Sequence, residues 1–130
     1  MKQFTLITVL LASIAVAQSL SGEMTVVVPF PFVVGGAVLP SGHYVIRDHG
    51  TYLQISSTQT RNVLVPTHDA LRSESNGSKL VFHCYEGSCF FDSMWTTGQN
   101  RGRQLFPSSA EKELAKRRAQ MNLAVLRPSN

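Results

Sequence analysis

Two runs of residues rich in apolar and aromatic side chains, 79–85 and 88–95, flank the dipeptide Glu86-Gly87. A two-residue connection that ends in Gly is typical of a tight β-hairpin, because Gly readily takes the positive φ that such turns require. This hairpin constrains the fold more than any other feature of the sequence. It predicts an antiparallel pair of strands near the middle of the chain, with a register fixed by the turn.

The N-terminus has the pattern of a secretory signal peptide. Lys2 provides a positive start, residues 4–17 carry no charge, and small side chains stand at Ala15 and Ala17, where a signal peptidase reads the chain. A membrane-spanning helix needs about 20 apolar residues, and polar residues follow too soon for that. We therefore expect residues 1–17 to be removed, the protein to be exported to the periplasm or the medium, and no membrane span to remain after cleavage.

Cleavage of a 130-residue chain after position 17 leaves 113 residues, so we expect one domain over 18–130. The mature chain keeps eleven of the twelve basic residues and all eight acidic ones, a small excess of positive charge. About half of the basic residues fall in or just before 101–118, where Phe106 is the one aromatic residue. Nucleic-acid binding would require basic and aromatic residues interleaved across a face, so this class is not expected.

The mature chain alternates apolar and polar residues with the period of β-strands. This pattern predicts a mainly β domain, an antiparallel β-sandwich or small barrel of about seven strands. The first strand contains Pro29 and Pro31, which cannot donate to a ladder, so we expect it to lie at an edge or to bend. The predicted strands are 24–32, 43–47, 51–56, 62–66, 79–85, 88–95 and 122–126.

One surface helix is expected near the C-terminus, over about 109–121. Ser108 and Glu111 have the spacing of a capping box, in which each side chain binds a free backbone N–H at the helix start. The stretches 67–78 and 96–102 are rich in polar residues and Gly, and we expect loops there, although the first could contain a helical turn.

The hairpin register places Cys84 opposite Cys89 as a non-hydrogen-bonded pair, the kind that brings side chains closest. An even number of cysteines in an exported protein favours a disulfide, so we predict a Cys84–Cys89 bridge. A redox-active pair is the competing interpretation, but such pairs are more often C-x-x-C next to a helix N-terminus.

No catalytic or metal-binding motif is found in the sequence. The residues around Cys89 resemble part of a papain-type nucleophile motif, but no His follows His83 to complete such a site. The four histidines have no compact metal-ligand spacing, and bridged cysteines cannot supply thiolates, so neither a metal nor another cofactor is expected. His83 and Asp92 fall on one face of the hairpin, where we expect a structural hydrogen bond rather than an acid–base pair.

Aromatic residues lie on both faces of the hairpin, which leaves two interpretations. They fill the core, or one face lines a ligand site, in which case Tyr85, Phe90 and Trp95 would face the ligand. We expect a non-enzymatic binding or structural module of the cell envelope. It would take a small apolar or saccharide ligand or an envelope protein, and its oligomeric state stays open. The alternative is an exported enzyme whose site is assembled from residues distant in sequence.

Residues 28–36, VPFPFVVGG, and 39–46, LPSGHYVI, resemble a recurring opening of small exported acidobacterial proteins of unknown function. Residues 80–83 and 90–95, and then Arg103, Glu111 and Leu114, fit the second half of the same family, so the resemblance covers most of the mature chain. The cysteine pair is not part of that pattern. The resemblance implies a mainly β domain with a late helix, and it implies no activity and no site residues.

Overall fold

A computed structural model describes residues 22–72, 77–117 and 121–129 of the chain. The predicted signal peptide, residues 1–17, lies outside the described residues. Within them, the protein is mainly β, as the alternating pattern predicted, with ten strands and one helix. The elements in chain order are β1 (Glu23–Val28), β2 (Phe32–Val34), β3 (Ala37–Leu39), β4 (Gly42–Asp48), β5 (Tyr52–Ser56), β6 (Val63–Leu71), β7 (Lys79–Tyr85), β8 (Ser88–Trp95), β9 (Arg101–Leu105), α1 (Ser109–Lys116) and β10 (Asn122–Leu126).

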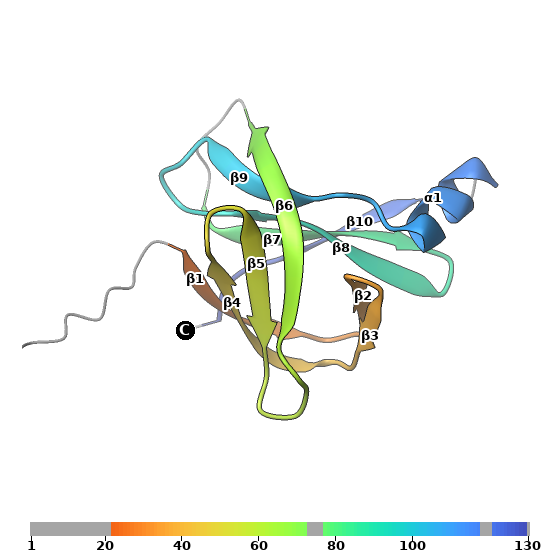
Figure 1. Cartoon of the computed structure of the whole chain (residues 1–130), viewed down its shortest axis with the longest axis horizontal. Helices are drawn as coiled ribbons and strands as arrows, with labels where there is room; N and C mark the ends of the chain where they lie inside the picture. The colour runs from red at the N-terminus through yellow and green to blue at the C-terminus, as the bar shows by residue number, and fades with distance from the viewer. Residues whose placement is uncertain (1–21, 73–76, 118–120, 130) are drawn as a thin grey trace, which may run out of the picture.

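The strands form one strongly curled antiparallel ladder in the order β1-β4-β5-β6-β9-β8-β7-β10. The β2–β3 hairpin joins it through a short parallel pairing of Val33 with Phe90 on β8. Figure 1 shows the ladder curling until the C-terminal end of the chain lies beside β1, where the Ser129 N–H donates to the Thr25 carbonyl at 2.9 Å. No ladder joins β1 and β10 in the described part of the chain, so the sheet is not closed and the architecture is that of a sandwich or an open barrel.

The predicted first strand divides at its prolines. β1 ends at Val28 and lies at one end of the ladder, and β2 begins after Pro31, so the chain bends where the missing N–H donors predicted. Gly35 and Gly36 take positive φ, 57° and 80°, and reverse the chain between β2 and β3. The β2–β3 hairpin accounts for two of the strands beyond the seven expected.

The prediction of a loop over 96–102 was wrong at its end, because β9 begins at Arg101. The prediction of a loop over 67–78 was wrong at its start, because β6 continues to Leu71. These two polar segments pair with each other. Arg103 on β9 contributes ion pairs to Asp69 on β6 and, at 3.2 Å, to Asp48 on β4. Backbone pairing, these ion pairs and the core residues Val65 and Leu105 together hold the two strands in the sheet.

The interior of the barrel is filled by side chains. Alternate residues of β1 are buried, and Phe32 makes edge-to-face contacts with Tyr44 and Phe82 at ring-centroid distances of 5.1 and 5.5 Å. Sixteen buried apolar residues form one continuous core. The core face of the β7–β8 hairpin contributes Leu80, Phe82, Phe91 and Met94.

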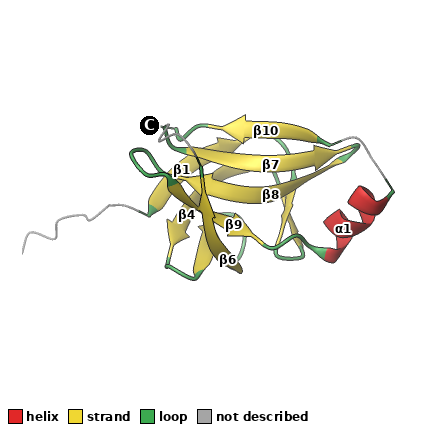
Figure 2. Cartoon of the chain, turned by 90° about the horizontal axis from the view of Figure 1, so that it is seen from above, coloured by secondary structure: helices red, strands yellow, loops and turns green. Residues whose placement is uncertain are grey.

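α1 begins at Ser109, as predicted, but its capping and its end differ from the prediction. The Ser108 Oγ accepts from the Glu111 N–H at 3.1 Å, so half of the predicted capping box is present, but the Glu111 side chain turns toward the sheet. The helix ends at Lys116, earlier than the predicted 121, and residues 118–120 lie outside the described residues. Figure 2 shows α1 beside the turn end of the β7–β8 hairpin. Glu111 is the one buried residue of the helix.

Candidate functional site

The β7–β8 hairpin follows the predicted register from its turn to Phe82, which pairs with Phe91. Beyond that point the register shifts, so that Val81 faces Ser93 and Asp92 is the extra residue of a β-bulge. The bulge lies where the outer edge of β8 changes its partner, from β2 to β9. It was not predicted from the sequence.

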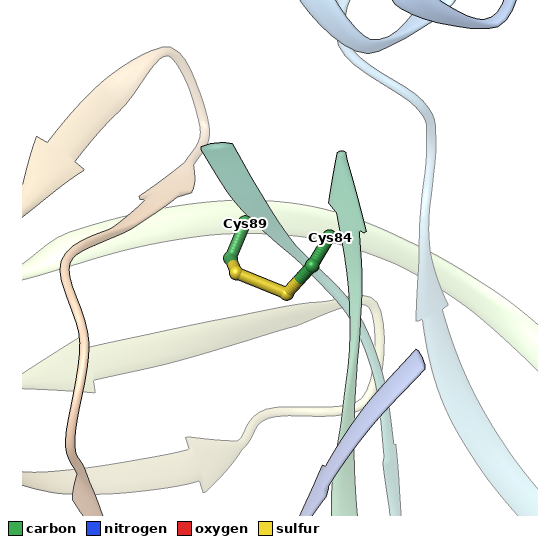
Figure 3. Close-up of a disulfide and its surroundings, with 2 residues drawn as sticks. All are labelled: Cys84 and Cys89. Carbon is green, nitrogen blue, oxygen red and sulfur yellow. A yellow bond between two sulfur atoms is a disulfide. The ribbon is translucent and has the colours of Figure 1, made fainter. Parts of the chain in front are cut away.

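The predicted disulfide between Cys84 and Cys89 is confirmed. The two residues pair directly across the hairpin with their Cα atoms 3.9 Å apart, and the bridge joins the strands next to the turn (Figure 3). Both cysteines are partly buried against the core. The bridge therefore fixes the end of the hairpin that carries His83 and Tyr85.

A cluster of four polar side chains lies between this end of the hairpin and α1. The Glu111 Oε2 atom is 2.9 Å from the Tyr85 hydroxyl, which donates to it, and 2.9 Å from the His83 Nδ1. The other ring nitrogen, Nε2, lies 3.5 Å from the Asp92 Oδ2. We call His83, Tyr85, Asp92 and Glu111 the Glu111 cluster. It links the helix to the hairpin through one carboxylate that is only 8% exposed.

The environment of the cluster keeps Tyr85 protonated. Burial raises the pKa of Tyr85 to about 12, and the hydrogen bond to Glu111 and the negative charges of Glu111 and Asp92 act in the same direction. The phenol is therefore neutral near pH 7 and serves as a hydrogen-bond donor to Glu111.

The second oxygen of Glu111, Oε1, accepts no hydrogen bond from any residue of the described part of the chain. The buried side-chain atoms without a partner there are Thr60 Oγ1 and Thr67 Oγ1. Since Oε1 is also unpaired but is not one of these, it must keep access to solvent. Glu111 also lines a surface hollow.

This hollow lies between α1 and the sheet and has a volume of about 210 Å³. A wider space of about 620 Å³ lies next to it along the helix, and the two are lined in common by Val33, Gly36, Phe90 and Ser108. We call the two together the α1 groove. Its lining is mostly apolar. The inner part is lined by Val34, Val65, Phe91, Leu105 and Phe106 as well as Glu111, and the outer part by Val38, Ala110, Leu114 and Arg117, among others.

The structure brings together two of the three aromatic residues predicted to face a ligand. Phe90 lines both parts of the α1 groove, and its ring packs edge-to-face against Tyr85 at 5.8 Å between centroids. Trp95 lies at the other end of the hairpin, where its Nε1 donates to Ser93 and the Arg72 guanidinium stacks over its ring. Trp95 therefore does not lie near the α1 groove.

His83 and Asp92 lie at ion-pair distance, 3.5 Å, without the predicted hydrogen bond between them, and His83 makes its hydrogen bond with Glu111. The sequence interpretation missed Glu111, because its spacing from Ser108 assigned it to the capping box. One signal was present. Leu114 and Ala115, three and four positions later, belong to the apolar stripe of the helix, so Glu111 lies on the face that turns toward the protein.

We found no protein-family model, no characterised protein and no solved structure that matches the chain. None of the helices in the described residues is long and apolar enough to cross a membrane. The same part of the chain contains no group of three or more His, Cys, Asp or Glu side chains placed to hold a metal ion. The α1 groove and the Glu111 cluster are the features of the structure that bear on function.

Proposed function

We propose that the mature chain is an exported, non-enzymatic binding module that holds a small apolar ligand in the α1 groove. One observation carries this proposal: the groove stays open and apolar beside a barrel whose interior is filled. The sixteen buried apolar residues form one continuous core, and the open apolar surface of the α1 groove lies outside it, so we place the ligand there. An apolar lining also favours an apolar ligand over a saccharide, the other ligand class that the sequence allowed.

The two faces of the β7–β8 hairpin have different roles in this proposal. Phe82 and Phe91 pack in the core, whereas Phe90 points to the groove from the neighbouring position on β8. On the other side of the groove, Val38 of β3 is 71% exposed. Covering such surface with a ligand is favourable, at about 25 cal/mol for each Å² of apolar area removed from water.

The geometry of the Glu111 cluster disfavours the alternative, an exported enzyme. Carboxylates lie against both ring nitrogens of His83, so neither is available as a general base. The pKa of Tyr85, raised to about 12, also makes its phenol a poor base or nucleophile near pH 7. The cluster is better suited to hold α1 in place and to present Glu111 to the groove.

A titration of the isotope-labelled mature protein with n-octanol, followed by ¹H–¹⁵N chemical shifts, tests the site. An octyl chain about half buried gains about 3 kcal/mol, which corresponds to weak binding with a Kd in the millimolar range or above. The largest shifts should fall on α1 and on the Val33 and Phe90 segments. Shifts concentrated on other surfaces, or no concentration-dependent shift on these segments, would refute the proposal.

A matched pair of variants locates the ligand. Leu114→Glu places a carboxylate in the apolar lining of the groove, and the cost of desolvating it should weaken octanol binding by at least about tenfold. Leu64→Glu makes the same change at an exposed position on β6 outside this lining and should leave the affinity unchanged. Equal effects of the two variants would argue against the α1 groove.

Export is supported by the signal-peptide pattern and by the resemblance to small exported proteins. N-terminal sequencing of protein recovered from the periplasm or the medium should begin at Gln18. Protein that keeps Met1 and remains in the cytoplasm would contradict this part of the proposal.

A further inference from the structure

We propose that the ligand of the α1 groove carries a primary ammonium group, which binds Glu111 at the inner end of the groove while the apolar part lies along α1. This inference rests on the proposed function and specifies the chemical class of the ligand. It is drawn from the unpaired oxygen of Glu111, the charge of the surrounding cluster and the aromatic rings beside it.

One oxygen of the Glu111 carboxylate, Oε1, is free to accept a hydrogen bond. Tyr85 and His83 both bind Oε2 of Glu111, and these two bonds fix the carboxylate in one orientation. Oε1 is left without a donor from the described residues and keeps access to solvent, and Glu111 is one of the residues that line the inner hollow. Water can donate to this oxygen in the free protein, and a ligand donor can replace that water, with a charged donor forming the stronger bond.

The second argument is charge. The Glu111 cluster contains two carboxylates and one imidazole, so its formal charge is negative even when His83 is protonated. A cation at Oε1 reduces this negative charge, whereas an anion would be repelled. In the outer part of the groove, Glu113 and Arg117 carry opposite charges and favour neither sign.

The third argument is the aromatic lining. Phe106, which is 59% exposed, lines the same hollow as Glu111, and the largely buried rings of Phe90 and Phe91 border it. Aromatic ring faces attract cations, and rings grouped with an acidic side chain form a typical binding site for ammonium groups. The hollow therefore combines an acceptor, a negative field and aromatic surfaces around one small space.

The experiment compares three probes with the same octyl chain, namely octylammonium chloride, n-octanol and sodium octanoate, titrated by chemical shift into the mature protein at neutral pH. We expect octylammonium to bind at least about tenfold more tightly than octanol, because a hydrogen bond to a charged group is worth a factor of this size. Octanoate should bind most weakly. If octanol or octanoate binds as tightly as octylammonium, the inference is wrong while the proposed function stands. If none of the three binds at the groove, both fail.

Glu111→Gln keeps the shape of the side chain and removes its charge, so it should bring octylammonium down to the affinity of octanol. Glu23→Gln, at an exposed position on β1, makes the same change of net charge away from the groove and should keep the preference. A preference for octylammonium that survives in folded Glu111→Gln would overturn the inference.

Because Glu111 also links α1 to the hairpin, its substitution could unfold the helix, and a second variant avoids this problem. Phe106 is 59% exposed, so Phe106→Leu should not disturb the core. Loss of one aromatic face should reduce the ratio of octylammonium to octanol affinity about two- to fivefold. An unchanged ratio would show that the ring does not contact the cation and would count against the inference.

Discussion

Replacement of Tyr85 by Phe tests the Glu111 cluster through the effect of pH on stability. In the fold, the Tyr85 hydroxyl donates to the Glu111 carboxylate at 2.9 Å, and the residue is only 8% exposed. Phe fills almost the same volume and lacks the donor. Near neutral pH, we expect Tyr85→Phe to lower the free energy of unfolding by about 2 kcal/mol, the usual contribution of a hydrogen bond to a charged group.

Alkaline pH should remove this difference. The pKa of Tyr85 is 10 in an unfolded chain and is raised to about 12 in the fold, so the unfolded state loses the phenol proton first. The contribution of the protonated phenol is whole below pH 10 and declines as the pH rises to about 12. A pKa difference of this size corresponds to at most about 3 kcal/mol. The variant lacks the group and should not show this loss, so the gap between the two proteins should close or reverse.

Urea unfolding followed by circular dichroism, at pH values from about 8 to about 12, gives the two free energies. Non-reducing electrophoresis of each sample checks that the disulfide stays intact. The wild-type protein and Tyr85→Phe share all other titrating groups, including Tyr44, whose pKa is also raised by burial. Their difference therefore isolates Tyr85. A difference that is constant over the whole pH range would refute the placement of Tyr85 against Glu111.

Three further predictions concern the elements that position the groove. Mass spectrometry of exported protein alkylated without reduction should find no labelled cysteine, and two labelled thiols would exclude the bridge. The double variant Cys84→Ser/Cys89→Ser should lower the free energy of unfolding by less than the ~3 kcal/mol expected for a disulfide that closes a 15-residue loop. Gly102→Ala would place a Cβ 2.5 Å from the Trp95 ring. We therefore expect the free energy of unfolding to fall by about 1–3 kcal/mol and the tryptophan fluorescence to shift. A variant as stable as the wild-type protein would contradict this packing. Ser108→Ala removes the N-cap of α1 and should cost about 1 kcal/mol in urea unfolding, and no change would mean that the cap contributes nothing.

The parts of the fold that could be predicted depend on contacts between residues close in sequence. Glu86-Gly87 determines the pairing of Cys84 with Cys89, because a two-residue turn leaves only one register for the residues beside it. β9 could not be predicted in this way. Its residues are polar, and it forms because β6 and β8 supply partners on both sides and because Arg103 pairs with acidic residues distant in sequence.

The candidate site was less predictable than the fold. The sequence left two roles open for Phe90, core filling and contact with a ligand. Only the arrangement of α1 and the β2–β3 hairpin shows that Phe90 borders a groove. The spacing from Ser108 already explained Glu111 as a capping residue. Its contact with His83, 28 positions earlier on the hairpin, was therefore not expected. Contacts between a helix and a distant strand depend on how the elements pack, which single-sequence patterns do not determine.

A high-resolution structure of the protein purified from the host that exports it tests the central proposal most directly. We expect the α1 groove to contain an elongated apolar molecule along α1, with a hydrogen-bond donor at the Glu111 Oε1 atom. A groove that is closed by side chains, or empty while a ligand occupies another surface, would contradict it.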